Sequence, residues 1–258
     1  MSFHVLYKSF KNLLKHPLKM SRFLSEMKHY NKANTNPEFK ASAKNFYMCL
    51  NDWDDAAGSL GVYFYQDLWG AKKIFQRKPS EHFDIGSRID GFVAHVLSFM
   101  PVTLIDIRPL PQHVEKLNFT QADATNLENI PDGSITSLSS LCAPEHFGLG
   151  RYGDPVDPEA CFKAMKSMQR VLKSGGHLYI AVPIGDHNAV AFNAHRIFKP
   201  ELIAETLNEL KLVDFSVISD MKRRRGYFEN IDFTKFHEMN FGTDNNGLVV
   251  GLFEFVKQ

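Results

Sequence analysis

From about residue 80 to the C-terminus, short apolar runs alternate with stretches whose apolar residues recur at helical spacing. The runs predict seven strands, within residues 81–86, 101–107, 117–123, 134–141, 177–185, 212–218 and 247–256. Helices are predicted at residues 88–99, from Pro158 to the Gly175–Gly176 pair, and at 200–210. Because strands and helices alternate, we expect an α/β fold: a Rossmann-like, seven-stranded, mostly parallel sheet with helices on both faces.

The first 74 residues lack this alternation, and we expect them to form a helical N-terminal extension (1–74) before the α/β domain (75–258). Its apolar residues recur at near-helical spacing: Phe10, Leu13, Leu14 and Leu18. Five cations precede the first acid, Glu26: Lys8, Lys11, Lys15, Lys19 and Arg22. Such a helix can lie on an anionic membrane as a weak peripheral contact. We favour the alternative, a helix that packs on the domain with its lysines in water. Residues 31–39, rich in Asn and Pro, are expected to form a linker.

Composition narrows the functional classes. A net charge of +1 over 258 residues gives no overall attraction to nucleic acid. No apolar run reaches the roughly 18 residues that span a bilayer, and lysines interrupt the N-terminus where a secretory signal would be apolar. The three cysteines lack paired spacing, so neither a disulfide framework nor a metal site is predicted. A reducing compartment, and thus a cytoplasmic location, is expected.

Three predicted strands in succession end in acidic residues. In parallel sheets of this type, ligands bind at the carboxyl ends of the strands. The first strand ends in Asp84, Gly86 and Ser87, where glycine lets the backbone approach a ligand. The second ends in Asp106, beside Ile107 and twenty residues after Gly86, the spacing at which an acid accepts hydrogen bonds from ribose hydroxyls. The third ends in Asp123 and Ala124, where an Asp can meet an adenine amino group.

The cofactor predicted from these ends is S-adenosylmethionine rather than NAD. The pyrophosphate of NAD requires a loop with three closely spaced glycines, but "GSRIDG" offers only Gly86 and Gly91. No Lys-Ser/Thr pair follows, so a P-loop is not predicted either. Asp84 at the start of the loop would repel a pyrophosphate, whereas it suits the ammonium of a methionine group.

The fourth strand runs into "EHFGLGRYGDP", residues 145–155, which has almost nothing to bury. Histidine is well suited to take a proton near neutrality, so His146 is the candidate catalytic base. Glu145 is expected to orient its ring or to contact the cofactor. Arg151 and Tyr152 are candidates to hold an acidic or hydroxyl-rich acceptor, with Asp154 fixing Arg151; alternatively, Arg151 and Asp154 are a structural pair that shapes the loop.

After the fifth strand, "FNAHRIF" places His195 and Arg196 near the same pocket as candidate substrate contacts. The alternative for Arg196 is a structural arginine that ties its loop down.

Four segments resemble, in order and spacing, the motifs of class I S-adenosylmethionine-dependent methyltransferases: "DIGSRIDG", "LIDIR", "QADATNL" and "VLKSGGHLYIAVP". Three more resemble an uncharacterised methyltransferase-like family whose members occur among bacterial genes for surface-polysaccharide assembly: "YFYQDLWGAKKI", "EHFGLGRYGDPVDPEACFKAM" and "FNAHRIF". The resemblance covers about residues 60–220. The chain departs from common methyltransferases in having Ser87 and Arg88 in place of the second and third glycines after Asp84.

The resemblance implies methyl transfer from S-adenosylmethionine to an oxygen of a small polar acceptor, a sugar or nucleotide-linked sugar in surface-glycan synthesis. The acceptor class comes from the resemblance alone. One alternative is a non-catalytic module that binds a nucleotide or a partner; the reduced glycine loop favours it, whereas Asp84, Gly86 and Asp106 favour the enzyme. Another is NAD-dependent redox chemistry on a sugar nucleotide, which would need a tyrosine–lysine pair or a fuller glycine motif.

Overall fold

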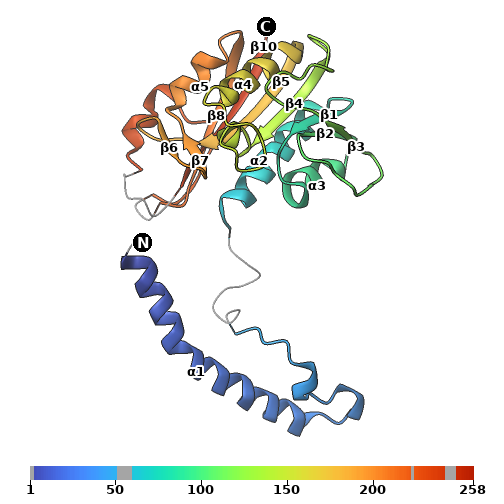
Figure 1. Cartoon of the computed structure of the whole chain (residues 1–258), viewed down its shortest axis with the longest axis vertical. Coiled ribbons are helices and arrows are strands. Elements are labelled where there is room, and N and C mark those ends of the chain that lie inside the picture. The colour runs from blue at the N-terminus through green and yellow to red at the C-terminus, as the bar shows by residue number, and fades with distance from the viewer. Residues whose placement is uncertain (1–2, 51–59, 222–223, 242–247) are drawn as a thin grey trace. The chain divides into compact units, whose positions relative to one another are not determined.

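The computed structural model describes residues 3–50, 60–221, 224–241 and 248–258, without the side chains of residues 3–16 and Asn45. The chain forms two compact units, Met1–Ser59 and Leu60–Gln258 (Figure 1). This boundary precedes the division after residue 74 that the sequence suggests. The reason is helix α2 (Val62–Arg77), whose buried face packs against the sheet of the second unit.

The first unit contains helix α1 (Phe3–Ala33) and two short 3-10 helices, Pro37–Phe39 and Ala43–Asn45. Residues 31–39, expected to be a linker, instead begin a segment that folds back on α1. The hydroxyl of Tyr30 donates to the carbonyl of Phe39 at 3.0 Å, and the side chain of Asn31 pairs with both backbone groups of Ala41. The side chains of Lys8, Lys11 and Lys15 lie outside the described residues. Among the helices described, none has the length and apolarity that crossing a bilayer requires.

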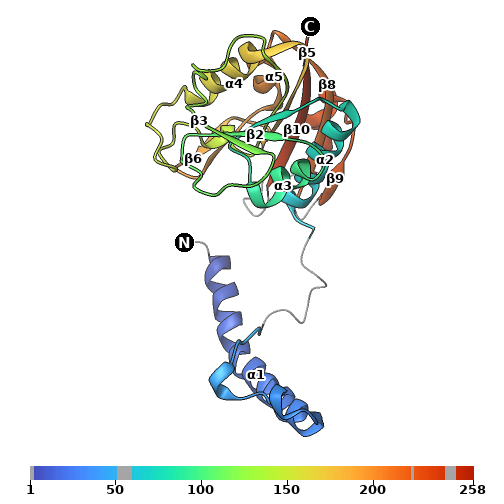
Figure 2. The same cartoon turned by 90° about the vertical axis from the view of Figure 1, so that its right-hand side faces the viewer.

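The second unit is built on one mostly parallel sheet. Its strands are β1 (His82–Ile85), β2 (Val102–Asp106), β3 (Leu117–Gln121), β4 (Ile135–Leu141), β5 (Leu172–Pro183), β8 (Leu210–Ser219), β9 (Gly226–Phe228) and β10 (Val249–Lys257). Their spatial order is β3-β2-β1-β4-β5-β10-β8-β9; Figure 1 labels the strands of this order except β9, which Figure 2 labels. The first five are parallel, whereas β10 runs antiparallel to both β5 and β8. The expected Rossmann-like α/β fold is confirmed, with β9 as an eighth strand.

Helices cover both faces of this sheet because each strand presents alternate side chains to the two sides. Helix α4 (Ala160–Val171) and helix α5 (Pro200–Thr206) pack on one face, against Leu178 and Ile180 of β5 among others. Helix α2, a π-helical turn at Ile89–Val93 and helix α3 (Ala94–Leu97) pack on the other face, against Tyr179 of β5. The near-continuous apolar strands of the sequence follow from burial on both sides.

A buried ion cluster fixes α2 to the sheet. Glu254 of β10 is fully buried, and its carboxylate lies 2.8 Å from Nη2 of Arg77 and 3.2 Å from Nζ of Lys73. Nδ1 of His177 lies 2.9 Å away. Burial alone would raise the pKa of Glu254, but the close contact with His177 and the charges of Lys73 and Arg77 outweigh it and lower the pKa to about 2.

Besides β9, two further features of the second unit were not predicted from the sequence. A hairpin of β6 (Ala189–Ala191) and β7 (His195–Ile197) follows β5 and forms its own two-stranded sheet. In addition, β5 begins at Leu172, where the sequence suggested helix up to the Gly175–Gly176 pair. Three-residue strands carry too little periodic pattern to be recognised in a sequence. Strand β7 nevertheless matters for the site, because it places His195 near the 3-10 helix that follows β4.

Candidate active site

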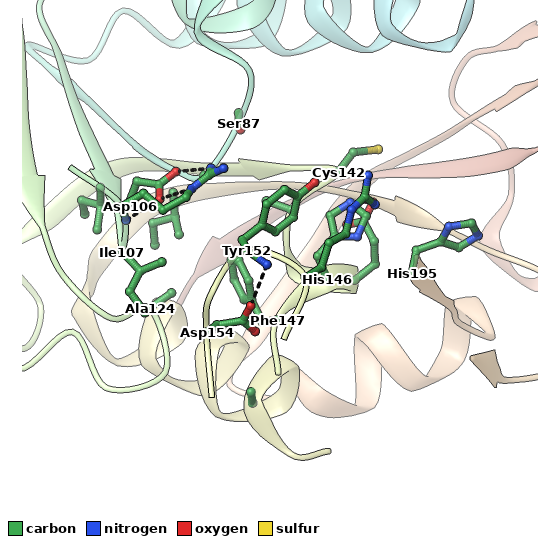
Figure 3. Close-up of a pocket in the computed structure, with 18 of the residues that line it drawn as sticks. Ser87, Asp106, Ile107, Ala124, Cys142, His146, Phe147, Tyr152, Asp154 and His195 are labelled. Carbon is green, nitrogen blue, oxygen red and sulfur yellow. Dashed lines mark hydrogen bonds and ion pairs between the residues drawn. The ribbon is translucent and has the colours of Figure 1, made fainter. Parts of the chain in front are cut away.

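A cavity with a volume of about 820 Å³ lies at the carboxyl ends of the central strands (Figure 3). Strand β1 pairs with β2 on one side and β4 on the other, which makes the β1–β4 boundary the topological switch point where ligands bind in such sheets. The ends of β1, β2, β3 and β4 line the cavity, together with residues from the 145–155 segment, the first turn of α2, and His195 of β7. All these elements belong to the second unit.

The loop after β1 brings the backbone close to the end of β4. Gly86 has φ +71°, a left-handed conformation that favours glycine. A Cβ at this position would lie 3.2 Å from Cβ of Ala143, which follows β4. Gly86 and Ser87 both line the cavity as the sequence predicts. The glycine therefore lets a ligand approach the backbone between β1 and β4.

Asp84 does not line the cavity, which corrects the expectation that its carboxylate faces the ligand. It is fully buried beneath the loop, where it accepts hydrogen bonds from the backbone N–H of Ser87 at 3.0 Å and from the Ser87 hydroxyl at 2.7 Å. The Ser139 hydroxyl of β4 donates to the same carboxylate. Burial raises the pKa of Asp84 to about 6, against the lowering effect of these bonds. Its role is to hold the loop on the sheet.

Asp106 lies at the end of β2 and lines the cavity, as predicted. Its Oδ1 accepts from the backbone N–H of Arg108 at 2.8 Å and from Nε at 3.0 Å, while Oδ2 accepts from Nη2 at 2.8 Å. A carboxylate offers about four acceptor positions, and Arg108 uses three of them. For Asp106 to bind two ribose hydroxyls, Arg108 must therefore release at least one of the acceptor positions that it occupies.

An apolar strip lies beside Asp106. Ile107 and Ala124 both line the cavity and lie near one another in Figure 3. Asp123 also lines it, and its Oδ1 accepts from the backbone N–H of Thr125 at 2.8 Å. This edge combines flat apolar surface with a carboxyl group, which suits a nucleobase that carries an amino group.

The 145–155 segment folds tightly over the cavity because its glycines take left-handed conformations. Gly148, Gly150 and Gly153 have φ of +77°, +70° and +83°. A Cβ on Gly148 would lie 1.9 Å from the backbone oxygen of Asp157, so no other residue fits there. Asp154 closes the loop, since its carboxylate accepts from the N–H groups of Gly148 at 2.6 Å and Tyr152 at 3.1 Å. Asp154 thus shapes the backbone and makes no ion pair with Arg151, contrary to expectation.

His146 has a tautomer fixed by its contacts. Its Nδ1 lies 2.6 Å from the backbone oxygen of Ala194. A carbonyl only accepts, so Nδ1 carries the proton and Nε2 presents a lone pair. Burial lowers the pKa of His146 to about 4, with the charge of Arg151 adding to the effect. The ring is therefore neutral at neutral pH, with Nε2 ready to take a proton.

Glu145 precedes it in a 3-10 helix, Pro144–His146, and also lines the cavity. The residue is 2% exposed, and burial raises the pKa of its carboxyl to about 8. Its Oε1 lies 3.7 Å from Nε2 of His146, and its Oε2 is buried with no hydrogen-bond partner among the described residues. A buried polar atom without a partner costs about 1–3 kcal/mol, so this oxygen calls for an explanation.

Cationic and aromatic groups form the outer part of the site. Nη1 of Arg151 donates to the backbone oxygen of Ala194 at 2.9 Å, and its guanidinium lies 5.0 Å from the centre of the Tyr152 ring. His195 lines the cavity nearby, and burial and the charge of Arg151 lower its pKa. No carboxylate neutralises Arg151 within the described residues, which leaves its remaining donors for an anionic or hydroxyl-rich ligand.

Arg196 is buried and does not line the cavity, which corrects its assignment as a substrate contact. Its guanidinium donates to the backbone oxygens of Phe147 at 2.6 Å and Pro158 at 3.3 Å. Arg196 is instead the structural arginine of the alternative prediction, and it ties the β6–β7 hairpin to the 145–155 segment.

The lining residues that were missed from the sequence include Tyr63 in the first turn of α2, Cys142 after β4, and Arg108. Tyr63 was missed because α2 was placed in the extension. Arg108 directly follows the recognised Asp106 motif, so its position was the signal. Cys142, with φ +50°, gave no signal. Among the described residues, no three His, Cys, Asp or Glu side chains are arranged to hold a metal.

Comparison with known proteins supports the fold. A family model described as "Caenorhabditis protein of unknown function, DUF268" matches residues 120–242. Comparison with curated protein sequences yields no match. Among solved structures, 1,6-didemethyltoxoflavin-N1-methyltransferase from Burkholderia thailandensis, determined with 1,6-didemethyltoxoflavin and S-adenosylhomocysteine, has a TM-score of 0.51 at 16% identity. That alignment covers 75% of this chain and 78% of the methyltransferase.

Two further structures have the same fold. The YcgJ protein of Bacillus subtilis has a TM-score of 0.50 at 15% identity, over 75% of this chain and 98% of its own. The [4+2]-cyclase SpnF has a TM-score of 0.50 at 14% identity, over 74% and 81%. At these identities the likeness shows the fold alone, which is the Rossmann-like fold of methyltransferases. A methyltransferase and a cyclase both share it, so the reaction must be argued from the site.

Proposed function

We propose that this protein transfers a methyl group from S-adenosylmethionine to a small polar acceptor. One observation carries the proposal: a single cavity joins a glycine loop at the end of β1, a carboxylate at the end of β2, and an unprotonated histidine nitrogen after β4. The first two features suit a nucleoside cofactor, and the third suits removal of a proton from a nucleophile.

The residues present fit S-adenosylmethionine. Gly86 leaves open the space that a Cβ would fill between β1 and β4. Asp106 would accept from the ribose hydroxyls, and Ile107, Asp123 and Ala124 would contact the adenine. Asp84 would act indirectly, by fixing the glycine loop through Ser87.

When bound, S-adenosylmethionine would supply a methyl group on a sulfonium, whose sulfur would keep the electron pair of the carbon–sulfur bond as the acceptor's lone pair bonds to the methyl carbon. His146 would take the acceptor's proton on Nε2, while Nδ1 keeps its hydrogen bond to Ala194. The glycines of the 145–155 segment and the Arg108–Tyr152 contact would limit the access of water.

Arg151, Tyr152 and His195 would hold the acceptor at the outer part of the site. The unneutralised charge of Arg151 supports an acceptor with an anionic or hydroxyl-rich part. O-methylation of a sugar or nucleotide-linked sugar in surface-glycan synthesis remains the prediction that the sequence resemblance makes.

A second candidate is a module that binds a nucleoside ligand without methyl transfer. One observation favours it: Arg108 already uses three acceptor positions of Asp106, which opposes ribose binding. The fold likeness to a [4+2]-cyclase is consistent with other uses of this site.

Calorimetric titration with S-adenosylhomocysteine, with NAD as the comparison ligand, tests the proposal. We expect binding of S-adenosylhomocysteine in the micromolar range and at least tenfold weaker binding of NAD. Absence of S-adenosylhomocysteine binding by the folded protein would overturn the proposed function. If S-adenosylhomocysteine binds but no offered acceptor receives a methyl group from S-adenosylmethionine, the second candidate is favoured.

A further inference from the structure

When Glu145 is ionised, two hydrogen-bond acceptors lie side by side in the wall of the cavity. One is Nε2 of His146, a lone pair because Nδ1 donates to Ala194. The other is the carboxyl group of Glu145, whose Oε1 lies 3.7 Å from that nitrogen. This distance exceeds a hydrogen bond, so the two groups do not satisfy each other. Oε2 of Glu145 has no partner within the described residues either.

Possible methyl-accepting groups differ in how many hydrogen-bond donors they bring to this pair. A hydroxyl brings one hydrogen, which can serve Nε2 or a carboxylate oxygen but not both. A primary amine brings two hydrogens and an ammonium brings three. Only a nitrogen group therefore satisfies His146 and an ionised Glu145 together, and a positive charge on it would compensate for a carboxylate that is 2% exposed.

Building on the proposed function, we infer that the methylated group is a primary amine, held between Nε2 of His146 and the carboxylate of Glu145. This assigns Glu145 to the acceptor rather than to the cofactor, and it makes N-methylation the reaction. An amine carried on a sugar would meet both this requirement and the resemblance-based acceptor class.

The reaction balances without a further reactant. An ammonium first loses one proton to Nε2 of His146, which leaves two N–H groups and a nitrogen lone pair. That lone pair forms the bond to the methyl carbon, and the carbon–sulfur bond breaks with its electron pair staying on sulfur. The product is a methylammonium, whose positive charge faces Glu145, together with neutral S-adenosylhomocysteine. The proton on His146 leaves to solvent.

The groups around Glu145 determine its protonation. Cys142, Tyr63 and His146 are neutral neighbours at neutral pH, and Arg151 is the cation that acts on it. Burial nevertheless raises the pKa of the carboxyl to about 8 despite Arg151, so it holds a proton at neutral pH when no ligand cation is bound. An ammonium bound there would replace that proton, and its binding would therefore strengthen as the pH rises from 6 to 8.

The probe is sinefungin, an S-adenosylmethionine analogue in which an amine-bearing carbon replaces the methylated sulfonium. We would measure its Kd and that of S-adenosylhomocysteine by calorimetry on the full-length protein. At pH 8, we expect sinefungin to bind at least tenfold more tightly than S-adenosylhomocysteine. At pH 6, most of this preference should be lost. Glu145→Gln should abolish the preference at both pH values while S-adenosylhomocysteine affinity stays within threefold.

Glu205→Gln, at an exposed position on α5, is the matched control and should keep the wild-type preference. Equal affinities of the two ligands for wild-type protein at pH 8 would overturn the inference and favour a hydroxyl acceptor held by a protonated Glu145. The pH dependence requires no variant, so it tests the inference even if Glu145→Gln fails to fold. Failure of S-adenosylhomocysteine to bind would instead overturn the proposed function.

Discussion

The guanidinium of Arg108 lies 4.6 Å from the centre of the Tyr152 ring, and this contact joins the two sides of the cavity. Arg108 follows β2 and is bound to Asp106, whereas Tyr152 belongs to the 145–155 segment after β4. The ring also contacts Arg151 at 5.0 Å. The predicted ribose-binding carboxylate is therefore physically linked to the predicted acceptor loop.

Replacing Tyr152 tests this link. Tyr152→Ala removes the ring that Arg108 and Arg151 contact, and an exposed cation–π contact contributes about 0.5–1 kcal/mol. We expect faster proteolytic cleavage within residues 145–155 and a higher KM for the acceptor. Tyr152→Phe keeps the ring face and should behave like wild type in the proteolysis assay. Equal cleavage rates for Tyr152→Ala and wild type would contradict the link.

Asp106→Ala should weaken S-adenosylhomocysteine binding by about 10- to 100-fold, because charge-assisted hydrogen bonds contribute about 1.5–3 kcal/mol. Calorimetry measures the change. Asp132→Ala is the control, since Asp132 pairs with Arg170 and does not line the cavity at the carboxyl ends of the strands. Unchanged affinity in folded Asp106→Ala would remove the ribose assignment.

His146→Ala should abolish methyl transfer and leave S-adenosylhomocysteine affinity within about threefold, a difference below roughly 0.7 kcal/mol. The structure adds a pH expectation. Because burial lowers the pKa of His146 to about 4, the ring resonance that disappears in the variant should titrate near pH 4 rather than near 6.5. Full activity of the variant would exclude the role given to His146, whereas a resonance that titrates near 6.5 would contradict the assigned pKa.

Glu254→Gln should lower the free energy of unfolding by about 2 kcal/mol near pH 7, because Arg77 loses its carboxylate partner and Lys73 keeps only that of Asp214. The folded-state pKa of Glu254 is about 2, below its ordinary value of 4.5. Its stabilising contribution is therefore fully present above pH 4.5 and is lost as the pH falls toward 2.

Urea unfolding at several pH values measures this effect. The difference between wild type and Glu254→Gln should shrink between pH 4.5 and pH 2.5. Glu229→Gln is the matched control, because Glu229 contacts Lys72 of α2 at 3.4 Å and both side chains are about half exposed. The free energy of unfolding should therefore fall by less than about 1 kcal/mol. A pH-independent difference for Glu254→Gln would contradict the assigned pKa.

Removal of residues 1–59 should leave S-adenosylhomocysteine affinity within about threefold. Every residue that lines the cavity lies in the second unit, beginning with Val62. Calorimetry on the shortened and full-length chains measures this. If only the full-length chain co-sediments with anionic vesicles, the membrane role of the basic segment replaces the packing role that we favour.

Most of the long strands were predictable because they are apolar runs, and the carboxyl ends of β1, β2 and β3 were marked by an acid or a glycine. Asp106 and Gly86 could be located in this way. The short hairpin β6–β7 and strand β9 could not, since three residues carry too little periodicity. Helix α2 has apolar residues on several sides, and its exposed Phe64 and Leu68 concealed which face it buries.

The candidate site was predictable by position but less so by orientation. Sequence spacing places Asp84 and Arg196 beside the pocket, yet both side chains turn inward to satisfy backbone groups. Which way a buried charge points depends on unpaired donors and acceptors from distant segments, such as Ser139 for Asp84 and Pro158 for Arg196. The unprotonated Nε2 of His146 likewise depends on Ala194, which is distant in the chain.

Arg196 also bears on how acceptor preference can change. It holds the course of the 145–155 main chain through carbonyl oxygens alone, at Phe147 and, just beyond the segment, at Pro158. These contacts do not depend on the identity of the side chains that the segment presents. Exchanges of Arg151 or Tyr152 therefore leave these main-chain contacts of Arg196 in place. A protein with this arrangement is suited to acquiring a new acceptor through single substitutions at its cavity rim.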